Sequence, residues 1–127
     1  MKPPSTNNCY NFRVISVDRI VDGDTVDVVI DLGFDVLHKA RIRLHGVNTP
    51  ETRTKDLEEK ALGLKAKSFV EHWLSQSDHF YIQTFKDAGG KYGRILGKIY
   101  LDEERSKCLN DDIITSGNGV EYFGGKR

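Results

Sequence analysis

The chain has 127 residues, the length of one domain, which excludes an enzyme with a separate cofactor-binding domain. Hydrophobic residues make up 38% and charged residues 30%, the balance of a globular protein rather than a membrane-spanning or disordered one. Lysine plus arginine and aspartate plus glutamate each number 19, so a polyanion would have to be met by a local patch or a bound cation.

The N-terminal residues indicate a cytoplasmic protein. The first ten residues lack the apolar run of a secretory signal, and no stretch reaches the length of about twenty apolar residues that a membrane span needs. We expect a flexible segment over residues 1–11 and one domain over residues 12–127. Cys9 and Cys108 lie in no metal-binding motif, and a reducing compartment favours free thiols at both.

Three strands are predicted in the first half of the chain. β-branched residues dominate residues 12–20 and 25–32, and Val26, Val28 and Ile30 alternate as in a half-buried strand. The sequence Asp22-Gly23-Asp24 between these strands is a hairpin-turn signal. A turn near residue 33 then leads to a third strand over Leu37–Leu44.

The second half alternates between helices and strands. Residues 47–60 lack periodicity and predict an irregular loop. A stripe at helical spacing then predicts an amphipathic helix ending near Gln76; it consists of Leu62, Ala66, Phe69, Val70, Trp73 and Leu74. Gly63 costs about 1 kcal/mol in a helix relative to alanine, so the helix is expected to start after it.

Two more strands and a short helix complete the predicted elements. The strands are expected over Phe80–Phe85 and residues 95–101, and the helix over residues 109–116, with Gly117 after its last turn. Five short strands with a helix between the third and fourth predict a mainly β fold with helices. The architecture that fits is a five-stranded Greek-key OB-fold barrel with an inserted amphipathic helix and a short second helix.

Oxygen donors are expected to converge at one end of this barrel. Strands two and three form a hairpin, so Asp24 must lie close to residues 45–48. Asp24, Asn48 and nearby carbonyls would form an all-oxygen cluster that favours a hard cation such as calcium. The alternative is that residues 22–25 are only a turn and residues 48–51 only the entrance to a loop.

Two arginines suit an anionic ligand. Arg43 interrupts an apolar run near the end of a strand, where it would either pair with Asp24 or Glu51 or bind a phosphate with its planar fork. Arg94 follows Gly93 and has the same two interpretations. Arginines, a cation site and Glu51 are the groups that phosphodiester cleavage requires, because they stabilise charge on the phosphate and orient or deprotonate a water.

The remaining polar and aromatic residues are assigned more simply. The four histidines show no metal-binding spacing and are expected to be solvated or structural. Tyr92, Tyr122 and Phe123 lie in loop-like segments and could stack on a base.

Three motifs in order resemble the staphylococcal nuclease (thermonuclease) family over nearly the whole chain. They are Ile20-Val21-Asp22-Gly23-Asp24-Thr25-Val26, Arg43-Leu44-His45-Gly46-Val47-Asn48-Thr49-Pro50-Glu51-Thr52 and Lys91-Tyr92-Gly93-Arg94. The chain is similar to the short members found on phages and plasmids. The resemblance implies an OB-fold barrel and calcium-dependent hydrolysis of DNA and RNA.

The resemblance also implies a role for each matching residue. Asp24, Asn48 and the carbonyl of Thr49 would hold calcium. Glu51 would be the general base, or would order the site. Arg43 and Arg94 would contact the scissile phosphate and its transition state. The substrate-binding positions would be Lys91, Tyr92 and Tyr122, with Phe123 beside the last.

The resemblance leaves the metal and the partner open. Asn48 stands where the family's type member has a second aspartate, so we expect weaker calcium binding and allow another divalent cation. The expected partners are DNA and RNA, preferably single-stranded, with no membrane and a monomeric protein. The rival hypothesis is a catalytically inactive OB-fold module that binds single-stranded nucleic acid or a protein.

Overall fold

The computed structural model describes residues 9–85 and 95–122. The elements in chain order are β1 (Cys9–Asp22), β2 (Thr25–Asp31), β3 (Leu37–Leu44), β4 (Gly46–Asn48), α1 (Leu57–Leu74), β5 (Phe80–Phe85), β6 (Ile95–Tyr100), α2 (Leu109–Thr115) and β7 (Val120–Tyr122). Neither described helix has the length and apolar character needed to cross a membrane.

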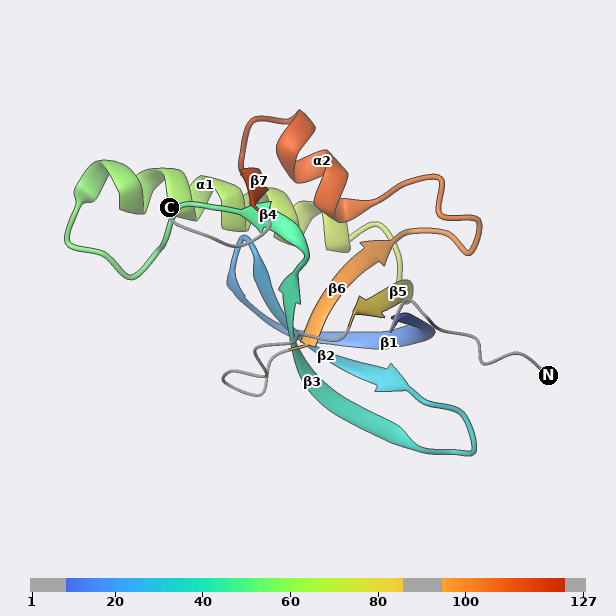
Figure 1. Cartoon of the computed structure of the whole chain (residues 1–127). Coiled ribbons are helices and arrows are strands. Elements are labelled where there is room, and N and C mark those ends of the chain that lie inside the picture. The colour runs from blue at the N-terminus through green and yellow to red at the C-terminus, as the bar shows by residue number, and fades with distance from the viewer. Residues whose placement is uncertain (1–8, 86–94, 123–127) are drawn as a thin grey trace.

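Five strands form a closed barrel in the order β1-β2-β3-β6-β5 (Figure 1). Neighbouring strands are antiparallel except β3 and β6, whose parallel pairing of Ile42 with Ile95 closes the barrel. This arrangement confirms the predicted OB-fold barrel. The two-stranded sheet of β4 and β7 was not predicted, because strands of three residues show no alternation in the sequence.

The core lies inside the barrel and under the two helices. Its fully buried side chains come from alternate positions of the strands and from both helices; the largest are Phe80, Ile30, Ile42, Leu44, Ile82, Ile99, Leu109 and Ile113. Cys108, which carries a free thiol, is buried as well, and this burial raises the pKa of the thiol.

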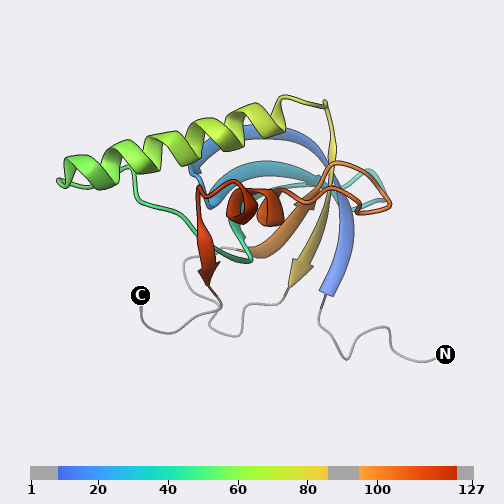
Figure 2. The same ribbon diagram turned by 90° about the horizontal axis from the view of Figure 1, so that it is seen from above.

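The helix α1 packs against β1 and begins earlier than predicted, at Leu57. Asp56 caps it, because the carboxylate of Asp56 accepts hydrogen bonds from the backbone N–H groups of Glu58 and Glu59. The expectation that the helix starts after Gly63 and the placement of Leu62 on the buried stripe are both wrong. Leu62 is 55% exposed. The N-terminal part of α1 extends beyond the barrel (Figure 2).

The helix α2 lies across the end of the barrel (Figure 2). Asn110 ties it to the strands: its side-chain amide donates to the carbonyls of His45 and Gly97 at 2.8 and 3.0 Å and accepts from the N–H of Ile99 at 3.2 Å. Gly117 ends the helix with a φ of +82°, as its position predicted. Residues 47–60, predicted as an irregular loop, contain most of β4 and the first turn of α1.

Candidate active site

A pocket of about 280 Å³ lies where the β1–β2 turn meets the chain that follows β3. It is lined by Asp22, Asp24, Thr25, Arg43, Asn48, Thr49, Glu51 and Tyr122. The structure thus brings together six residues that the sequence named for one site. The other named positions, Lys91, Tyr92, Arg94 and Phe123, lie outside the described residues.

Strand pairing brings the pocket residues together. Thr25 of β2 is the register partner of Arg43 of β3, so their side chains emerge from the same face of the hairpin. The N–H of Leu44 donates to the carbonyl of Asp24 at 2.8 Å and extends this pairing to the turn. The chain then turns back at Gly46, and Asn48 of β4 reaches the pocket.

Asp24 is the buried acid of the pocket, with 8% of the residue exposed. One carboxylate oxygen accepts from the Thr25 hydroxyl at 3.0 Å, and the other accepts from the Thr49 N–H at 3.0 Å. The same second oxygen lies 3.7 Å from Nη2 of Arg43. Asp24 therefore joins the β1–β2 turn to the residues that follow β4.

Arg43 is held in the pocket by several acceptors. Its Nη1 donates to the carbonyls of Leu44 at 3.0 Å and Val47 at 2.6 Å, and its Nη2 donates to Oδ1 of Asn48 at 3.3 Å. The ion pair with Asp24, which the sequence offered as one role for Arg43, is present, with 3.7 Å between Nη2 of Arg43 and Oδ2 of Asp24. Because Arg43 lines the pocket, its positive charge also acts on an anion that enters there.

Asp22 holds the segment that carries Glu51. Its Oδ1 accepts from the backbone N–H of Thr52 at 3.3 Å and from the Thr52 hydroxyl at 2.5 Å. The sequence pattern assigned no role to Thr52. Together, Asp22 and Asp24 fix both sides of Glu51, whose exposed side chain lines the pocket.

Glycine lets α1 approach this segment closely. A Cβ placed on Gly63 would lie 2.5 Å from the carbonyl oxygen of Glu51 and 2.9 Å from that of Pro50, which is shorter than real carbon contacts allow. A Cβ on Gly119 would similarly lie 3.1 Å from the carbonyl oxygen of Asn48. The cost of Gly63 as a helix residue is therefore offset by the packing of the Glu51 backbone.

A Gly63→Ala variant should lose both stability and function, although alanine is the better helix former. We expect the free energy of unfolding to fall by about 1–3 kcal/mol, as for an overpacked core, in place of the gain of about 1 kcal/mol from helix propensity. Any cleavage activity should fall as well, because the Glu51 backbone must shift. Denaturant unfolding and a cleavage assay measure both effects.

The control for Gly63→Ala is Ser68→Ala, at an exposed position of the same helix. It should be neutral or slightly stabilising. A Gly63→Ala protein at least as stable as the parent would show that the two carbonyls give way without cost.

The oxygen donors of the pocket have the chemistry of a cation site. Asp24 supplies a carboxylate, Asn48 an amide oxygen and Thr49 a carbonyl, and all three residues line the pocket. The hydroxyl oxygen of Thr49 is buried and has no hydrogen-bond partner within residues 9–85 and 95–122. The donor chemistry suits a hard cation. Within the described part of the chain, however, no group of three or more His, Cys, Asp or Glu side chains is arranged to hold a metal ion.

His45 belongs to the same stretch of chain but not to the pocket. Its ring stacks on Phe85 at 4.7 Å between centroids. Burial, with a smaller contribution from Lys98, lowers the pKa of His45, so the imidazole is neutral at pH 7. This agrees with the structural role expected for the histidines.

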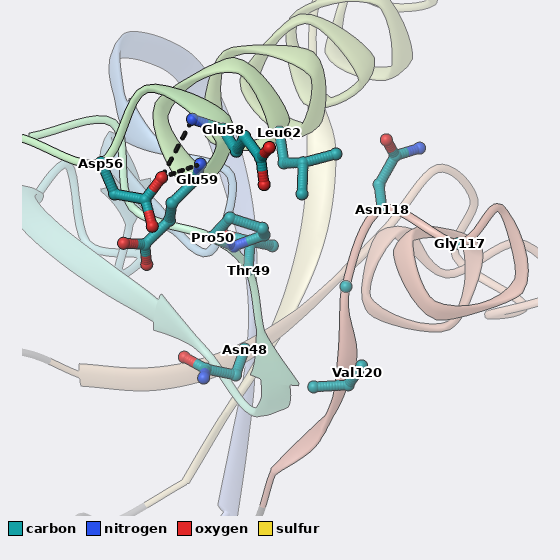
Figure 3. A pocket seen from close by; sticks show the side chains of 11 residues that line it. Asn48, Thr49, Pro50, Asp56, Glu58, Glu59, Leu62, Gly117, Asn118 and Val120 are labelled. Atoms are coloured by element: carbon teal, nitrogen blue, oxygen red, sulfur yellow. Dashed lines mark hydrogen bonds between the residues drawn. The ribbon is translucent and has the colours of Figure 1, made fainter. Parts of the chain in front are cut away.

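A second pocket, of about 450 Å³, shares Asn48 and Thr49 with the first and reaches the start of α1 (Figure 3). Its charged side chains are all acidic: Asp56, Glu58 and Glu59. The larger pocket has no basic side chain to bind a phosphate, whereas the smaller pocket has Arg43 beside its three carboxylates. The smaller pocket, with Arg43, remains the candidate site.

Comparison with known proteins gives consistent matches. The family model described as staphylococcal nuclease homologue matches residues 41–126. The chain is 33% identical over 126 residues to endonuclease YhcR of Bacillus subtilis, covering 95% of this chain and 10% of that protein. It is 33% identical over 88 residues to the thermonuclease of Staphylococcus intermedius, covering 69% of this chain and 49% of that protein. It is also 33% identical over 88 residues to protein ParB of Escherichia coli, covering 69% of this chain and 42% of that protein. The chain thus spans from a tenth to about half of the length of these relatives.

Proposed function

Because this chain belongs to the staphylococcal nuclease homologue family, we propose that it is a metal-dependent nuclease that hydrolyses phosphodiester bonds of DNA and RNA with little sugar or sequence specificity. The observation that carries the proposal is the gathering of Arg43, Glu51 and the oxygen donors Asp24 and Asn48 in one pocket. A cation, an arginine and a carboxylate are the groups that this reaction requires.

Arg43 and Glu51 divide the chemistry between them. The Arg43 guanidinium binds the oxygens of the scissile phosphate and stabilises the charge that develops on them. Glu51 accepts a proton from the attacking water as the water oxygen bonds to phosphorus and the bond to the leaving oxygen breaks. Arg94, assigned by the family resemblance, would act as a second phosphate-binding arginine.

Calcium is the proposed cofactor. Asp24, Asn48 and the Thr49 carbonyl would hold it, and their all-oxygen chemistry supports a hard cation. When bound, the ion would supply positive charge beside the phosphate. Asn48 brings no charge, so another divalent cation is also compatible with the site.

The proposed partners are single strands of DNA or RNA, bound by a monomer. The net charge of zero supports only modest nonspecific attraction to a polyanion. Binding then depends on local groups such as Arg43 and Tyr122; Tyr122 lines the pocket, and its ring would stack on a base.

The test is cleavage of single-stranded DNA and RNA by the full chain with calcium, with magnesium and with EDTA. We expect products with calcium and none with EDTA. If the strands are bound but remain intact with every metal, the chain is a binding module and not a nuclease.

An Asn48→Asp variant probes the cation site directly. The added charge should lower the half-saturating calcium concentration by about tenfold, because ligand charge tunes calcium affinity. Asn118→Asp adds the same charge in the neighbouring pocket and should leave that concentration unchanged. Equal shifts in the two variants would mean that the cation does not bind at Asn48.

A further inference from the structure

The outer face of the β2–β3 hairpin leads directly away from the candidate active site. Because Val26, Val28 and Ile30 are buried, the alternate residues of β2 and their partners on β3 face outward. From the pocket toward the tip, these outward pairs are Thr25 with Arg43, Asp27 with Arg41, Val29 with Lys39 and Asp31 with Leu37.

This face carries an excess of positive charge. Lys39 and Arg41 precede Arg43 at every second residue of β3, and both are exposed. Asp27 accepts hydrogen bonds from Arg41 at 2.8 and 3.1 Å, and Arg19 of β1 is its register partner on the other side. The hydrogen bond and charge of Arg41, together with the charge of Arg19, lower the pKa of Asp27. One carboxylate thus sits between two guanidinium groups, and Lys39 adds a third cation. The second carboxylate of this face, Asp31, has Arg13 of β1 as its register partner, so the cations remain in excess.

The tip of the hairpin presents an aromatic ring. Phe34 is 100% exposed, and its backbone has a φ of +54°, a conformation that a bulky residue rarely adopts. The turn around it is held by other groups: the N–H of Gly33 donates to the carboxylate of Asp31 at 2.8 Å, and the N–H of Val36 donates to the carbonyl of Gly33 at 2.9 Å. The turn is thus held without the ring of Phe34, which is left wholly open to solvent.

We propose that this face is a substrate-binding arm, on which the single strand leaving the scissile phosphate passes Arg41 and Lys39 and stacks one base on Phe34. The inference rests on the proposed nuclease function. Arg43 and Leu37 are six residues apart, which spans about 20 Å on a strand. That is about six nucleotides at the roughly 3.4 Å spacing of a stacked strand. Cations along the backbone and an aromatic platform are the groups that sequence-independent single-strand binding uses.

The test compares single strands of three and twelve nucleotides as substrates for the full chain. Phe34→Asn removes the ring and keeps a residue that accepts the positive φ, whereas Phe34→Tyr keeps an aromatic ring. We expect Phe34→Asn to raise KM for the twelve-nucleotide strand about tenfold, with kcat and the trinucleotide KM unchanged. Phe34→Tyr should behave like the parent.

A second pair of variants tests the cations. Lys39→Gln should make the dependence of log affinity on log salt shallower by about 0.7 for the long strand, the value expected when one phosphate fewer is neutralised by the protein. Lys65→Gln removes the same charge from an exposed position of α1 and should leave the slope unchanged.

Two results would overturn the arm, and they differ from failure of the nuclease proposal. If Phe34→Asn cleaves both strands with the parent's KM, the nuclease stands and the arm is wrong. If Phe34→Asn changes only the oligomeric state of the protein, measured as the mass of the assembly in solution, the tip is instead a contact between copies of the chain. If the parent cleaves neither strand, the nuclease proposal itself fails, and the arm fails with it.

Discussion

A Glu51→Gln variant is expected to cleave about 10²–10⁴-fold more slowly than the parent protein, the range for loss of a general base. The amide has nearly the shape of the carboxylate but cannot take the proton of the attacking water. Glu51 is exposed and its backbone is fixed by packing on Gly63, so the fold should survive. Single-turnover cleavage with saturating metal measures the effect, and thermal unfolding checks the fold.

The matched control is Glu58→Gln, which makes the same change in the neighbouring acidic pocket. Its cleavage rate should equal that of the parent. If Glu51→Gln also kept the parental rate, Glu51 would not be the base, and its position beside the cation donors would serve only the order of the site.

An Arg43→Lys variant should lose about 10²–10³ in kcat, because a point charge cannot reproduce a planar fork against a phosphate. It should also lower the free energy of unfolding by about 1–3 kcal/mol. The single nitrogen of lysine cannot take the positions of both Nη1, which donates to Leu44 and Val47, and Nη2, which donates to Asn48, so acceptors that are partly buried lose their donors. Steady-state kinetics and denaturant unfolding separate the two losses.

The control for Arg43→Lys is Arg105→Lys, which makes the same change at a residue that hydrogen-bonds Asn11, away from the candidate site. Cleavage should be unaffected there. An Arg43→Lys protein that was destabilised but fully active would show that the guanidinium only holds the backbone, and that phosphate binding lies elsewhere.

The strands of the barrel were predictable because their side chains alternate. Leu37–Leu44 and Phe80–Phe85 have the predicted bounds, and the turn at residues 22–24 falls where its aspartates and glycine indicate. The first strand was predicted over residues 12–20, whereas β1 runs from Cys9 to Asp22. At its start, Cys9 belongs to the strand because it pairs with Phe85, a contact that no local pattern reveals.

The start of α1 was predicted wrongly, although the low helix propensity of Gly63 on which the prediction rested is real. Gly63 does weaken a helix, but its missing side chain is what admits the Glu51 carbonyl, a contact between residues twelve positions apart. The signal that marks the true start was present: Asp56 precedes Glu58 and Glu59 as an N-cap followed by acidic residues.

The residues of the candidate site could be predicted from the sequence, but the hydrogen bonds between them could not. Hairpin geometry required Asp24 and residues 45–48 to be close, and the pocket contains Asp24 and Asn48. That Arg43 donates to three acceptors of the following segment, and that Thr52 binds Asp22, depends on the reversal of the chain at Gly46, which has a φ of +78°. The sequence does not encode such a tertiary turn in any periodic pattern.

The way residues 49–52 are held has a consequence for the dynamics of the protein. They join no strand ladder among the described elements; hydrogen bonds to the carboxylates of Asp22 and Asp24 and packing on Gly63 fix them. Local opening of this segment breaks few bonds and leaves the barrel closed, so the amides of Thr49 and Thr52 should exchange with deuterium far sooner than those of β2. On heating, inactivation would then precede global unfolding, and a melting curve alone would overstate the temperature range in which the site is assembled.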